Sequence, residues 1–285
     1  MAKFAEVQTL EVGDFKITFL PDGGGLVVPT ATYPASSEAG WAKYEDFLDE
    51  EGRLVVTIGG FLIETGEHKI VMDLGVGPQT VDFPGFGPFI GGKYLESWEK
   101  TGVERGEVTA VVYTHLHLDH VGWTTVEVDG QREFTFPNAR HLCTKVDWEF
   151  WLDDESGLGP NPETVQEPLK EKIEFIEAGD ELAPGITVLA TPGHTPGHIS
   201  LRLDAGDKQV YLIADLLHSE VQFYEADWFV AFDVDPETAR ETREKMYETV
   251  AQPNIIVGDG HFADAVFGQL KREGDGWRWQ ALPTD

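Results

Sequence analysis

Cysteine, basic residues and long apolar runs are all scarce in this sequence. Its 285 residues include one cysteine, Cys143, so an intrachain disulfide is excluded. No stretch reaches the run of roughly 18 apolar residues that a membrane-spanning helix needs. The first residues also lack the basic start and apolar stretch of a secretory signal. We therefore expect a cytoplasmic protein with no membrane partner.

The shortage of positive charge limits the partners further. There are 21 Lys and Arg residues against 51 Asp and Glu residues, which gives a formal net charge of −30 at pH 7. No basic cluster interrupts this acidity, and a negative field repels phosphate backbones. We therefore expect no nucleic-acid partner, and the acidity is typical of a highly soluble surface.

The sequence does contain a regular mixture of strand-like and helix-like segments. The clearest helix is Pro236–Val250, where Asp235 can cap the first turn and a proline fits the first helical position. Further helices are expected over Thr144–Leu152 and Lys93–Thr101. Elements mixed in this way favour an α/β fold with sheets covered by helices in one domain, residues 1–285. Apolar, β-branched runs predict strands at Phe15–Leu20, Leu54–Glu64, Lys69–Asp73, Ala110–Tyr113, Ile186–Ala190, Ile199–Leu203, Val210–Ala214 and Asn254–Val257.

Two long segments rich in glycine and proline separate some of these elements. They are Pro21–Arg53 and Gly75–Gly92. Loops of this length in a compact domain are usually functional or disordered. Three phenylalanines of the second segment, Phe83, Phe86 and Phe89, fit two interpretations: they wall a pocket, or they anchor the loop to the core.

Histidine is concentrated in the segment THLHLDHVG, which follows a predicted buried strand. In the extended start of this segment, His115 and His117 point to the same side, so one ion can contact both. Asp119 and His120 come next, where the chain turns into a helix, and they can face a second ion. Imidazole and carboxylate groups suit zinc, and also iron, manganese or cobalt.

Three further candidates repeat one structural context. His194, Asp215 and His261 each come just after an apolar, strand-like run. If those strands are neighbours, the side chains converge with the histidine cluster on one edge of the sheets. Two ions that share a bridging ligand lower the pKa of a shared water and supply hydroxide near neutral pH. The candidate ligands divide into His115, His117 and His194 for a first ion, Asp119, His120 and His261 for a second, and Asp215 between the two.

These residues resemble the signature of the metallo-β-lactamase superfamily. THLHLDH matches its HxHxDH motif, and TPGHTPGH, Asp215 and His261 follow in the family's order, so that the resemblance spans roughly residues 54–261. It implies an αββα sandwich, with two packed mixed sheets flanked by helices. It also implies two divalent metal ions, zinc first among them, at one edge of the sheets. Asp73 resembles a family aspartate that orients a metal-binding histidine, although a polar residue ending a strand is an equal alternative.

The resemblance also implies an activity. The bridging Asp215 argues against β-lactam hydrolysis, and the combined motif resembles lactonases and methyl parathion hydrolase. We therefore expect a hydrolase that opens lactones or cleaves esters by attack of a metal-bridging hydroxide, with Asp119 and His218 as catalytic residues. TPGHTPGHISL resembles the lactonase segment. ADLLHSEVQF has His218 where those lactonases typically carry tyrosine, and so resembles the methyl parathion hydrolase and aryl-lactonase branch.

Other interpretations stay open. Phosphotriester hydrolysis is the main alternative, and an iron-dependent persulfide dioxygenase, with one ion, or a non-catalytic metal-binding protein are further ones. His218 is either catalytic or a core histidine, and the sequence leaves a homodimer open. The remaining residues of interest are given structural roles: His198 as a structural histidine, His68 and His141 as strand or surface residues without a metal role, Cys143 as a buried strand residue, and Trp148 and Trp151 as core residues rather than pocket residues.

Overall fold

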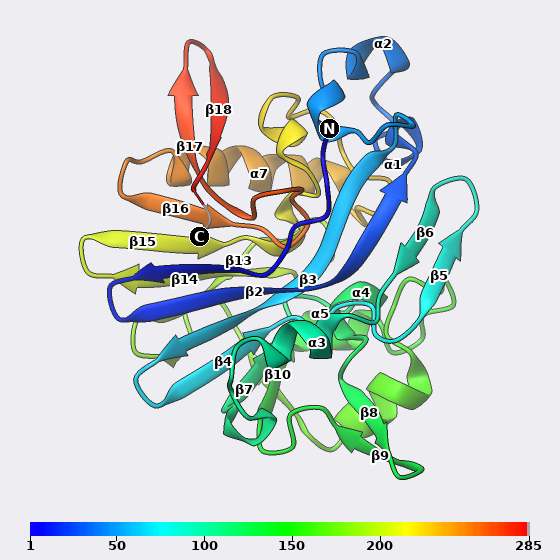
Figure 1. Cartoon of the computed structure of the whole chain (residues 1–285), viewed down its shortest axis with the longest axis vertical. Coiled ribbons are helices and arrows are strands. Elements are labelled where there is room, and N and C mark those ends of the chain that lie inside the picture. The colour runs from blue at the N-terminus through cyan, green and yellow to red at the C-terminus, as the bar shows by residue number, and fades with distance from the viewer. Residues whose placement is uncertain (284–285) are drawn as a thin grey trace.

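The computed structural model describes residues 1–283 and shows two sheets packed face to face (Figure 1). Both sheets mix parallel and antiparallel pairs. The second sheet has the strand order β12 (Glu181–Ala183), β13 (Ile186–Ala190), β14 (Ile199–Ala205), β15 (Lys208–Leu212), β16 (Ile255–Gly258), β17 (Phe267–Glu273) and β18 (Gly276–Ala281). The first has the order β11 (Ile173–Ile176), β10 (Arg140–Thr144), β7 (Ala110–Val112), β4 (His68–Met72), β3 (Leu54–Thr65), β2 (Phe15–Val27), β6 (Gly87–Ile90) and β5 (Thr80–Phe83), with β1 (Gln8–Val12) paired to β2.

The main core lies between the two sheets. Successive residues of a strand point to opposite faces, so alternate apolar residues divide between two layers. In β4, Ile70 and Met72 join the inter-sheet cluster with Leu201 and Leu212 of the second sheet. Val71, between them, belongs to a different cluster on the outer face of the first sheet. Strands that are apolar on both faces are buried on both faces, which requires covering helices.

Helices cover the two outer faces. On the first sheet, Trp98 of α3 (Tyr94–Glu99) and Trp148 of α5 (Lys145–Phe150) complete the outer cluster. On the second sheet, α7 (Pro236–Val250) packs Met246 and Tyr247 against β15 and β16 (Figure 1). The expected αββα sandwich of mixed sheets and flanking helices is therefore confirmed. The shorter elements are α1 (Pro29–Thr32), α2 (Glu38–Trp41), η1 (Glu45–Phe47), η2 (Arg105–Glu107), α4 (Leu118–Val121), β8 (Thr125–Val128), β9 (Gln131–Phe134), η3 (Pro162–Gln166), α6 (Glu167–Leu169), η4 (Ala214–Leu216) and η5 (Glu220–Phe223).

The predicted strands and helices are present, with ends that differ by a few residues. The predicted bounds of β13 and α7 agree with the observed ones. As expected for the cap of α7, the Asp235 carboxylate accepts a hydrogen bond from the Thr238 amide at 3.1 Å. The largest error is at β2, which was expected to end at Leu20 and continues to Val27. Its glycines allow this extension, because a Cβ on Gly24 would collide with the Val56 carbonyl of the paired strand.

The second glycine-rich segment is not an irregular loop, because it contains the antiparallel hairpin β5–β6. The base of this hairpin is held by the buried carboxylate of Asp22. Asp22 lies at the point in β2 where the pairing register with β3 shifts. This carboxylate accepts hydrogen bonds from the amides of Gly77, Gly92 and Tyr94 and from the indole N–H of Trp123, at 2.8–3.0 Å. The hairpin is thereby fixed beside the strand ends that carry the histidines. Within residues 1–283, no helix combines the length and the apolar character needed to cross a membrane.

Candidate metal centre

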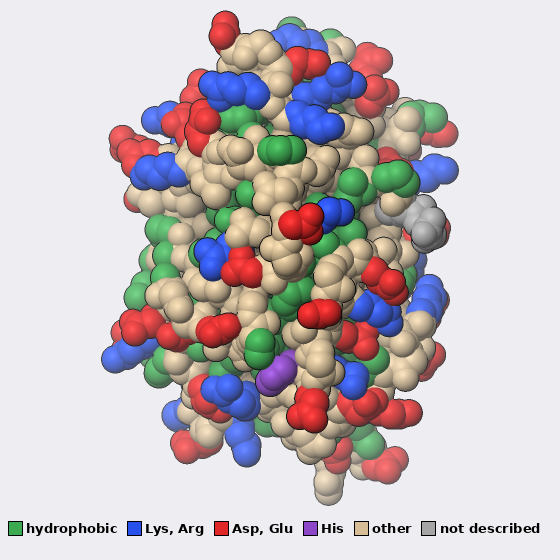
Figure 2. Space-filling model, turned by 90° about the vertical axis from the view of Figure 1, so that its left-hand side faces the viewer, with side chains coloured by type: hydrophobic (Ala, Val, Ile, Leu, Met, Phe, Trp, Pro, Cys, Tyr) green, Lys and Arg blue, Asp and Glu red, His purple; other side chains and the backbone are tan. Residues whose placement is uncertain are grey.

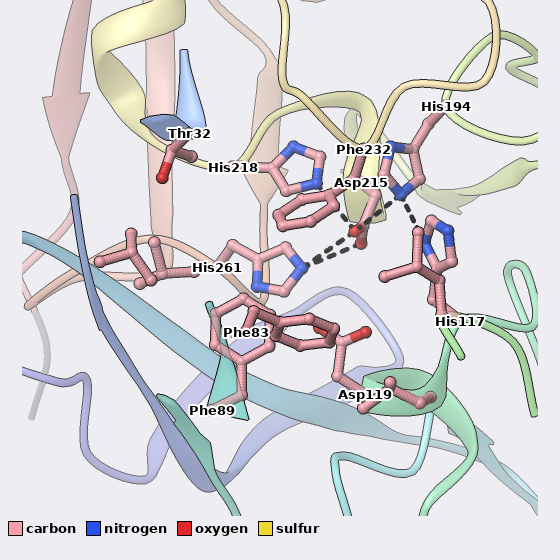
Figure 3. Close-up of a pocket in the computed structure, with 14 residues that line it drawn as sticks. Thr32, Phe83, Phe89, His117, Asp119, His194, Asp215, His218, Phe232 and His261 are labelled. Carbon is pink, nitrogen blue, oxygen red and sulfur yellow. Dashed lines mark hydrogen bonds and ion pairs between the residues drawn. The ribbon is translucent and has the colours of Figure 1, made fainter. Parts of the chain in front are cut away.

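The seven candidate ligands converge at one edge of the sandwich. In the first sheet, β7 leads directly into the histidine segment, and α4 begins within it. In the second sheet, β15 and β16 are parallel neighbours, so the residues that follow them emerge at the same edge. Figure 3 shows His117, His194 and His261 around Asp215. Asp215, His218 and His261 form one set of neighbouring donors. The seven candidate ligands themselves fall into two groups of neighbouring donors. The groups are His115, His117, His194 and Asp215, and Asp119, His120 and His261.

Ring nitrogens in the first group face one common point. The Nδ1 atom of His117 lies 2.9 Å from the Nε2 atom of His115 and 2.9 Å from the Nε2 atom of His194. The Nε2 atom of His194 is also 3.2 Å from Oδ2 of Asp215. All four side chains are buried. This arrangement has the donor types and the convergence that a bound cation requires.

The second group faces the same aspartate from the other side. The Nε2 atom of His120 lies 3.0 Å from Oδ1 of Asp215 and 3.8 Å from Oδ2 of Asp119. The Nε2 atom of His261 is 3.1 Å from each of the two Asp215 oxygens. Asp215 therefore lies between the two groups, which is the position of a bridging ligand.

Unpaired buried atoms test whether these residues fit metal ions. His120 Nε2 and Asp215 Oδ1 are buried and have no hydrogen-bond partner among the described residues. Buried polar atoms are normally paired, because leaving them unpaired costs free energy. These two atoms face each other at 3.0 Å, at the point where the second group converges. The donor set and its unmet bonding capacity therefore fit metal ions.

The outer nitrogens of three histidines have fixed partners. Nδ1 of His120 is 3.0 Å from Asp73, Nδ1 of His194 is 3.0 Å from Asp233, and Nδ1 of His261 is 2.8 Å from a backbone carbonyl, that of Thr57. When Nδ1–H donates to such an acceptor, the lone pair of Nε2 points inward. The expected orienting role of Asp73 thus has its hydrogen bond in the structure.

Two residues beside the site have unusual backbone angles. Asp73 has φ of 62° and Ala214, which precedes the central aspartate, has φ of 47°. Residues other than glycine rarely occupy this left-handed region, and strain of this kind concentrates at functional sites. The Asp73 carboxylate is also held by the Thr114 amide at 2.9 Å. The chain therefore holds these positions against their local preference.

Burial and the central carboxylate set the charge of the site. Burial holds the pKa of His115 and His117 well below the usual value, and the charges of neighbouring histidines lower it further. Burial would also lower the pKa of His194 and His261, but Asp215 outweighs it and raises both to about 9. Burial would raise the pKa of Asp215, but His120 and His261 hold it well below its usual range. Metal ions at His194 and His261 must therefore displace protons, whereas the neutral imidazoles of His115 and His117 can bind without losing one.

His218 lies on the same edge but outside the two groups. Its Nε2 atom is 3.0 Å from Oδ2 of Asp215, and its ring stacks on that of His261 with centroids 5.1 Å apart. Burial lowers the pKa of His218 to about 4, more than Asp215 raises it, so the imidazole is neutral at neutral pH. It also lines the pocket over the centre (Figure 3). A neutral imidazole at this point can donate a hydrogen bond through its N–H group.

The pocket over the centre is mainly apolar. Phe83 and Phe89 of the β5–β6 hairpin enter it, together with Phe232 of the loop before α7 (Figure 3). Their rings contact one another, with centroids 5.3–6.4 Å apart. The two interpretations of this hairpin therefore both apply: two phenylalanines wall the pocket, and Phe86 packs on Phe232 at 5.0 Å. The apolar lining is completed by Val27, Val56, Leu118 and Leu158.

The residues predicted to be structural lie outside the two groups of candidate ligands. His198 is hydrogen-bonded to Thr191 at 2.9 Å, and His141 lies in β10, 2.9 Å from the Tyr113 hydroxyl. Cys143 is buried in β10, and burial raises the pKa of its thiol. Trp148 and Trp151 are both core residues, as expected, but the Trp151 ring also lies 5.0 Å from that of His117.

Two site residues were missed in the sequence. Asp147 of α5 accepts hydrogen bonds from the amides of Leu116, at 2.8 Å, and Gly197, at 3.2 Å, and so ties the two histidine-bearing loops together. Asp233 orients His194. Neither carries a signal in its own neighbourhood, because both act on residues distant in the chain.

Comparison with known proteins defines the class of protein to which this chain belongs. The sequence profile of the metallo-beta-lactamase superfamily matches residues 60–251, and the chain belongs to this superfamily. It is 29% identical over 214 residues to the N-acyl homoserine lactonase AiiA of Bacillus thuringiensis subsp. kurstaki, covering 70% of this chain and 79% of that protein. It is also 29% identical over 218 residues to metallo-beta-lactamase domain-containing protein 1 of Xenopus laevis, covering 76% and 80%.

Solved structures share the fold over nearly the whole chain. AidC, described as a dizinc quorum-quenching lactonase, superposes with a TM-score of 0.82 at 22% identity and 98% coverage of both chains. The hydrolase AbOPH of the beta-lactamase superfamily gives a TM-score of 0.82 at 25% identity and 99% coverage of both chains.

Proposed function

We propose that this protein is a dinuclear metal-dependent hydrolase that opens lactones or cleaves esters. The observation that carries the proposal is the position of Asp215, whose carboxylate lies within 3.0–3.2 Å of nitrogens from both ligand groups. The similarity to proteins named N-acyl homoserine lactonases supports lactones as the substrate class. The chain's substrate is then a small molecule.

The proposed ligand set follows the two groups, and zinc suits their imidazole and carboxylate donors. When bound, two zinc ions would make a nucleophile available from water near neutral pH and stabilise negative charge on the carbonyl oxygen. The chain orients the donors through Asp73, Asp233 and the Thr57 carbonyl. The first ion is assigned His115, His117 and His194, the second Asp119, His120 and His261, and Asp215 bridges them.

Two pocket residues are proposed to act on the substrate. Neutral His218 presents an imidazole to the pocket and can donate a hydrogen bond to the carbonyl oxygen or to the leaving alkoxide. Asp119 belongs to the second group and also lines the same pocket, so its carboxylate is placed to exchange a proton with a bound substrate. Both residues belong to the wall that a bound ester would touch.

The apolar wall indicates which part of the substrate the pocket holds. Three phenylalanines line it, whereas the ionisable groups gather at its base (Figure 3). Removing an acyl chain or an aryl ring from water into such a wall stabilises binding by about 25 cal/mol per Å². We therefore propose a lactone or ester with an apolar substituent as the preferred substrate.

Phosphotriester hydrolysis is the second candidate, because the D-x-x-H-x-x-x-Q pattern has a structural basis. Gln222 lies behind His218 and accepts a hydrogen bond from its amide at 2.8 Å. The side-chain NH2 group of Gln222 donates to the Trp228 carbonyl at 3.0 Å. Gln222 thus holds the His218 imidazole beside the reacting group. The lactonase branch typically has a tyrosine at this position.

The first experiment measures metal content per chain on purified protein, followed by initial rates with a lactone, an aryl ester and a phosphotriester. We expect two zinc ions and turnover of the lactone or ester. Asp215→Ala should lose zinc and lower the rate by more than the roughly 10–100-fold that follows loss of an outer partner. Asp207→Ala, in the exposed turn between β14 and β15, is the matched control.

The other outcomes are equally informative. A higher rate with the phosphotriester than with the lactone would establish the second candidate. One iron per chain without hydrolysis of any of the three substrates would contradict both candidates and indicate an oxidative enzyme. Two zinc ions without hydrolysis would indicate a non-catalytic metal-binding protein.

A further inference from the structure

A buried ion pair lies directly behind one proposed ligand. Nη1 of Arg243, on α7, is 3.3 Å from Oδ2 of Asp233, and their side chains are 1% and 0% exposed. Charged side chains are almost never buried this completely unless they are paired. The pair is also outside the two groups of candidate ligands. Its position therefore calls for a role other than direct metal binding.

The two oxygens of Asp233 have separate partners. Oδ1 accepts a hydrogen bond from Nδ1 of His194 at 3.0 Å. Oδ2 accepts from Arg243 and from the Val230 amide, the latter at 3.2 Å. A carboxylate held at one oxygen by two donors cannot rotate freely, so the direction of its other oxygen is fixed. The orientation of the His194 ring is thereby fixed through Asp233.

The backbone around His194 is attached to the same helix. A Cβ on Gly193 would collide with Ala239 in the first turns of α7, so the chain approaches the helix closely here. The hydroxyl of Thr242 donates to the Pro192 carbonyl at 2.8 Å. The Val234 amide donates to the His194 carbonyl at 3.0 Å. Helix α7 and the loop before it therefore form one support for this ligand.

The support also reaches the substrate pocket. Phe232, which precedes Asp233 in the loop, enters the pocket beside the hairpin phenylalanines (Figure 3). The pocket wall and the hydrogen bond to His194 are thus carried by adjacent residues of one loop. By contrast, His120 is oriented by Asp73 at the end of β4, on the other sheet. His194 of the first proposed ion and His120 of the second are therefore oriented by different carboxylates from different parts of the fold.

We propose that Asp233 and Arg243 are positioning residues for the first metal ion. Arg243 fixes the Asp233 carboxylate, and Asp233 orients His194 so that its Nε2 atom faces the ion. The inference rests on the dinuclear site proposed above. It predicts that changes at this pair selectively lower the affinity for the first ion, because His120 of the second ion is oriented from the other sheet.

The test compares zinc affinity in Asp233→Asn, Arg243→Met and Arg243→Lys with the wild-type protein, using chelator competition to resolve the two ions. Loss of an outer partner typically costs about 10–100-fold in metal affinity. We expect a loss of this size for one ion in Asp233→Asn and Arg243→Met, with the other changed less than about threefold. Arg243→Lys, which keeps the charge, should recover part of the loss. The absorption spectrum of the cobalt-substituted protein should change in the same variants.

Controls separate positioning from general destabilisation. Arg240→Met removes an exposed arginine of the same helix, paired with Glu244, and should leave both affinities unchanged. The double variant Asp233→Asn/Arg243→Met should lose no more affinity than the larger single loss, because the two residues act as a unit. If Arg243→Met does not fold, Asp233→Asn and Arg243→Lys decide the question.

The failure of this inference differs from the failure of the proposed function. Folded variants with both zinc affinities and the cobalt spectrum unchanged, even with a lower melting temperature, would give the pair a structural role only. Equal weakening of both ions would also overturn it, because it would show no selectivity. A wild-type protein that binds no zinc would contradict the proposed function itself.

Discussion

His218 is the single residue whose role decides most about the chemistry of this site. It contacts Asp215 at 3.0 Å, lines the pocket and is neutral at neutral pH. If it donates a proton or a hydrogen bond to the reacting ester, His218→Ala should lower kcat/KM at least about tenfold, because acid–base catalysis contributes roughly 10²–10⁴-fold. The measurement is kcat/KM for a lactone with the zinc content of both proteins determined in parallel.

A second buried histidine provides the control for this residue. His198 lies in the same cluster of rings, 5.2 Å from His115, but does not line the pocket. His198→Gln should therefore change kcat/KM far less than His218→Ala. If His218→Ala keeps kcat/KM within about a factor of two with two zinc ions bound, His218 has no catalytic role.

At the scale of elements, the β5–β6 hairpin supplies the wall that selects the substrate. Phe83 is partly buried and faces the pocket, whereas Ile90 of the same hairpin is 51% exposed. Phe83→Ala removes apolar contact only from substrates long enough to reach it. We expect KM to rise about tenfold for a lactone with a long acyl or aryl substituent, because such contacts are worth roughly 1–3 kcal/mol.

The matched comparison uses a short-chain lactone and the variant Ile90→Ala. The short substrate should show a KM within about twofold of wild type in Phe83→Ala, and Ile90→Ala should leave both substrates unchanged. An equal rise in KM for long and short substrates would show that the hairpin positions the site rather than selecting the substrate.

For the molecule as a whole, charge and pH affect stability more than any single surface pair. Acidic and basic side chains are interspersed on the face shown in Figure 2, although the net charge is −30. Exposed ion pairs such as Lys245 with Glu241 contribute little, about 0–1 kcal/mol each. Buried titratable groups therefore change the free energy of unfolding with pH more than exposed ion pairs do.

His141 provides a clean case of this response. Burial, aided by Lys172, lowers its pKa to about 4 from 6.5. The unfolded chain therefore binds a proton in the window between pH 6.5 and about 4, where the folded protein does not, and stability falls as the pH falls through this window. His141→Gln should reduce this loss by up to about 3 kcal/mol, since one pKa unit corresponds to about 1.4 kcal/mol.

The measurement is urea unfolding of wild type and His141→Gln at several pH values in one buffer series. His68→Gln, at a partly exposed position in β4, is the control for removing an imidazole outside the core. Identical slopes in all three proteins would show that His141 does not contribute. The comparison between variants cancels the contribution of the metal-binding histidines.

The sequence predicted the elements whose signals are local. Helix α7 carries its own capping aspartate and N-terminal proline, and the buried strands are continuous apolar runs, so both were located from nearby residues. The hairpin β17–β18 was missed, because β17 changes from a buried first half to three exposed charged residues and β18 contains no β-branched residue. The extension of β2 was missed because glycine favours turns unless a neighbouring strand requires a close approach.

By itself, the sequence determined the donor types and their order along the chain, because ligands at strand ends follow recognisable apolar runs. Apart from Asp73, it could not determine which residues hold those donors. Asp233, Asp147 and Arg243 act on partners 31–50 residues away or across a loop, and only packing of the two sheets and α7 brings them together. The direction of Phe83 and Phe89 into the pocket was likewise decided by the fold. Local spacing specifies which groups are present, whereas hydrogen bonds between distant segments specify how they are oriented.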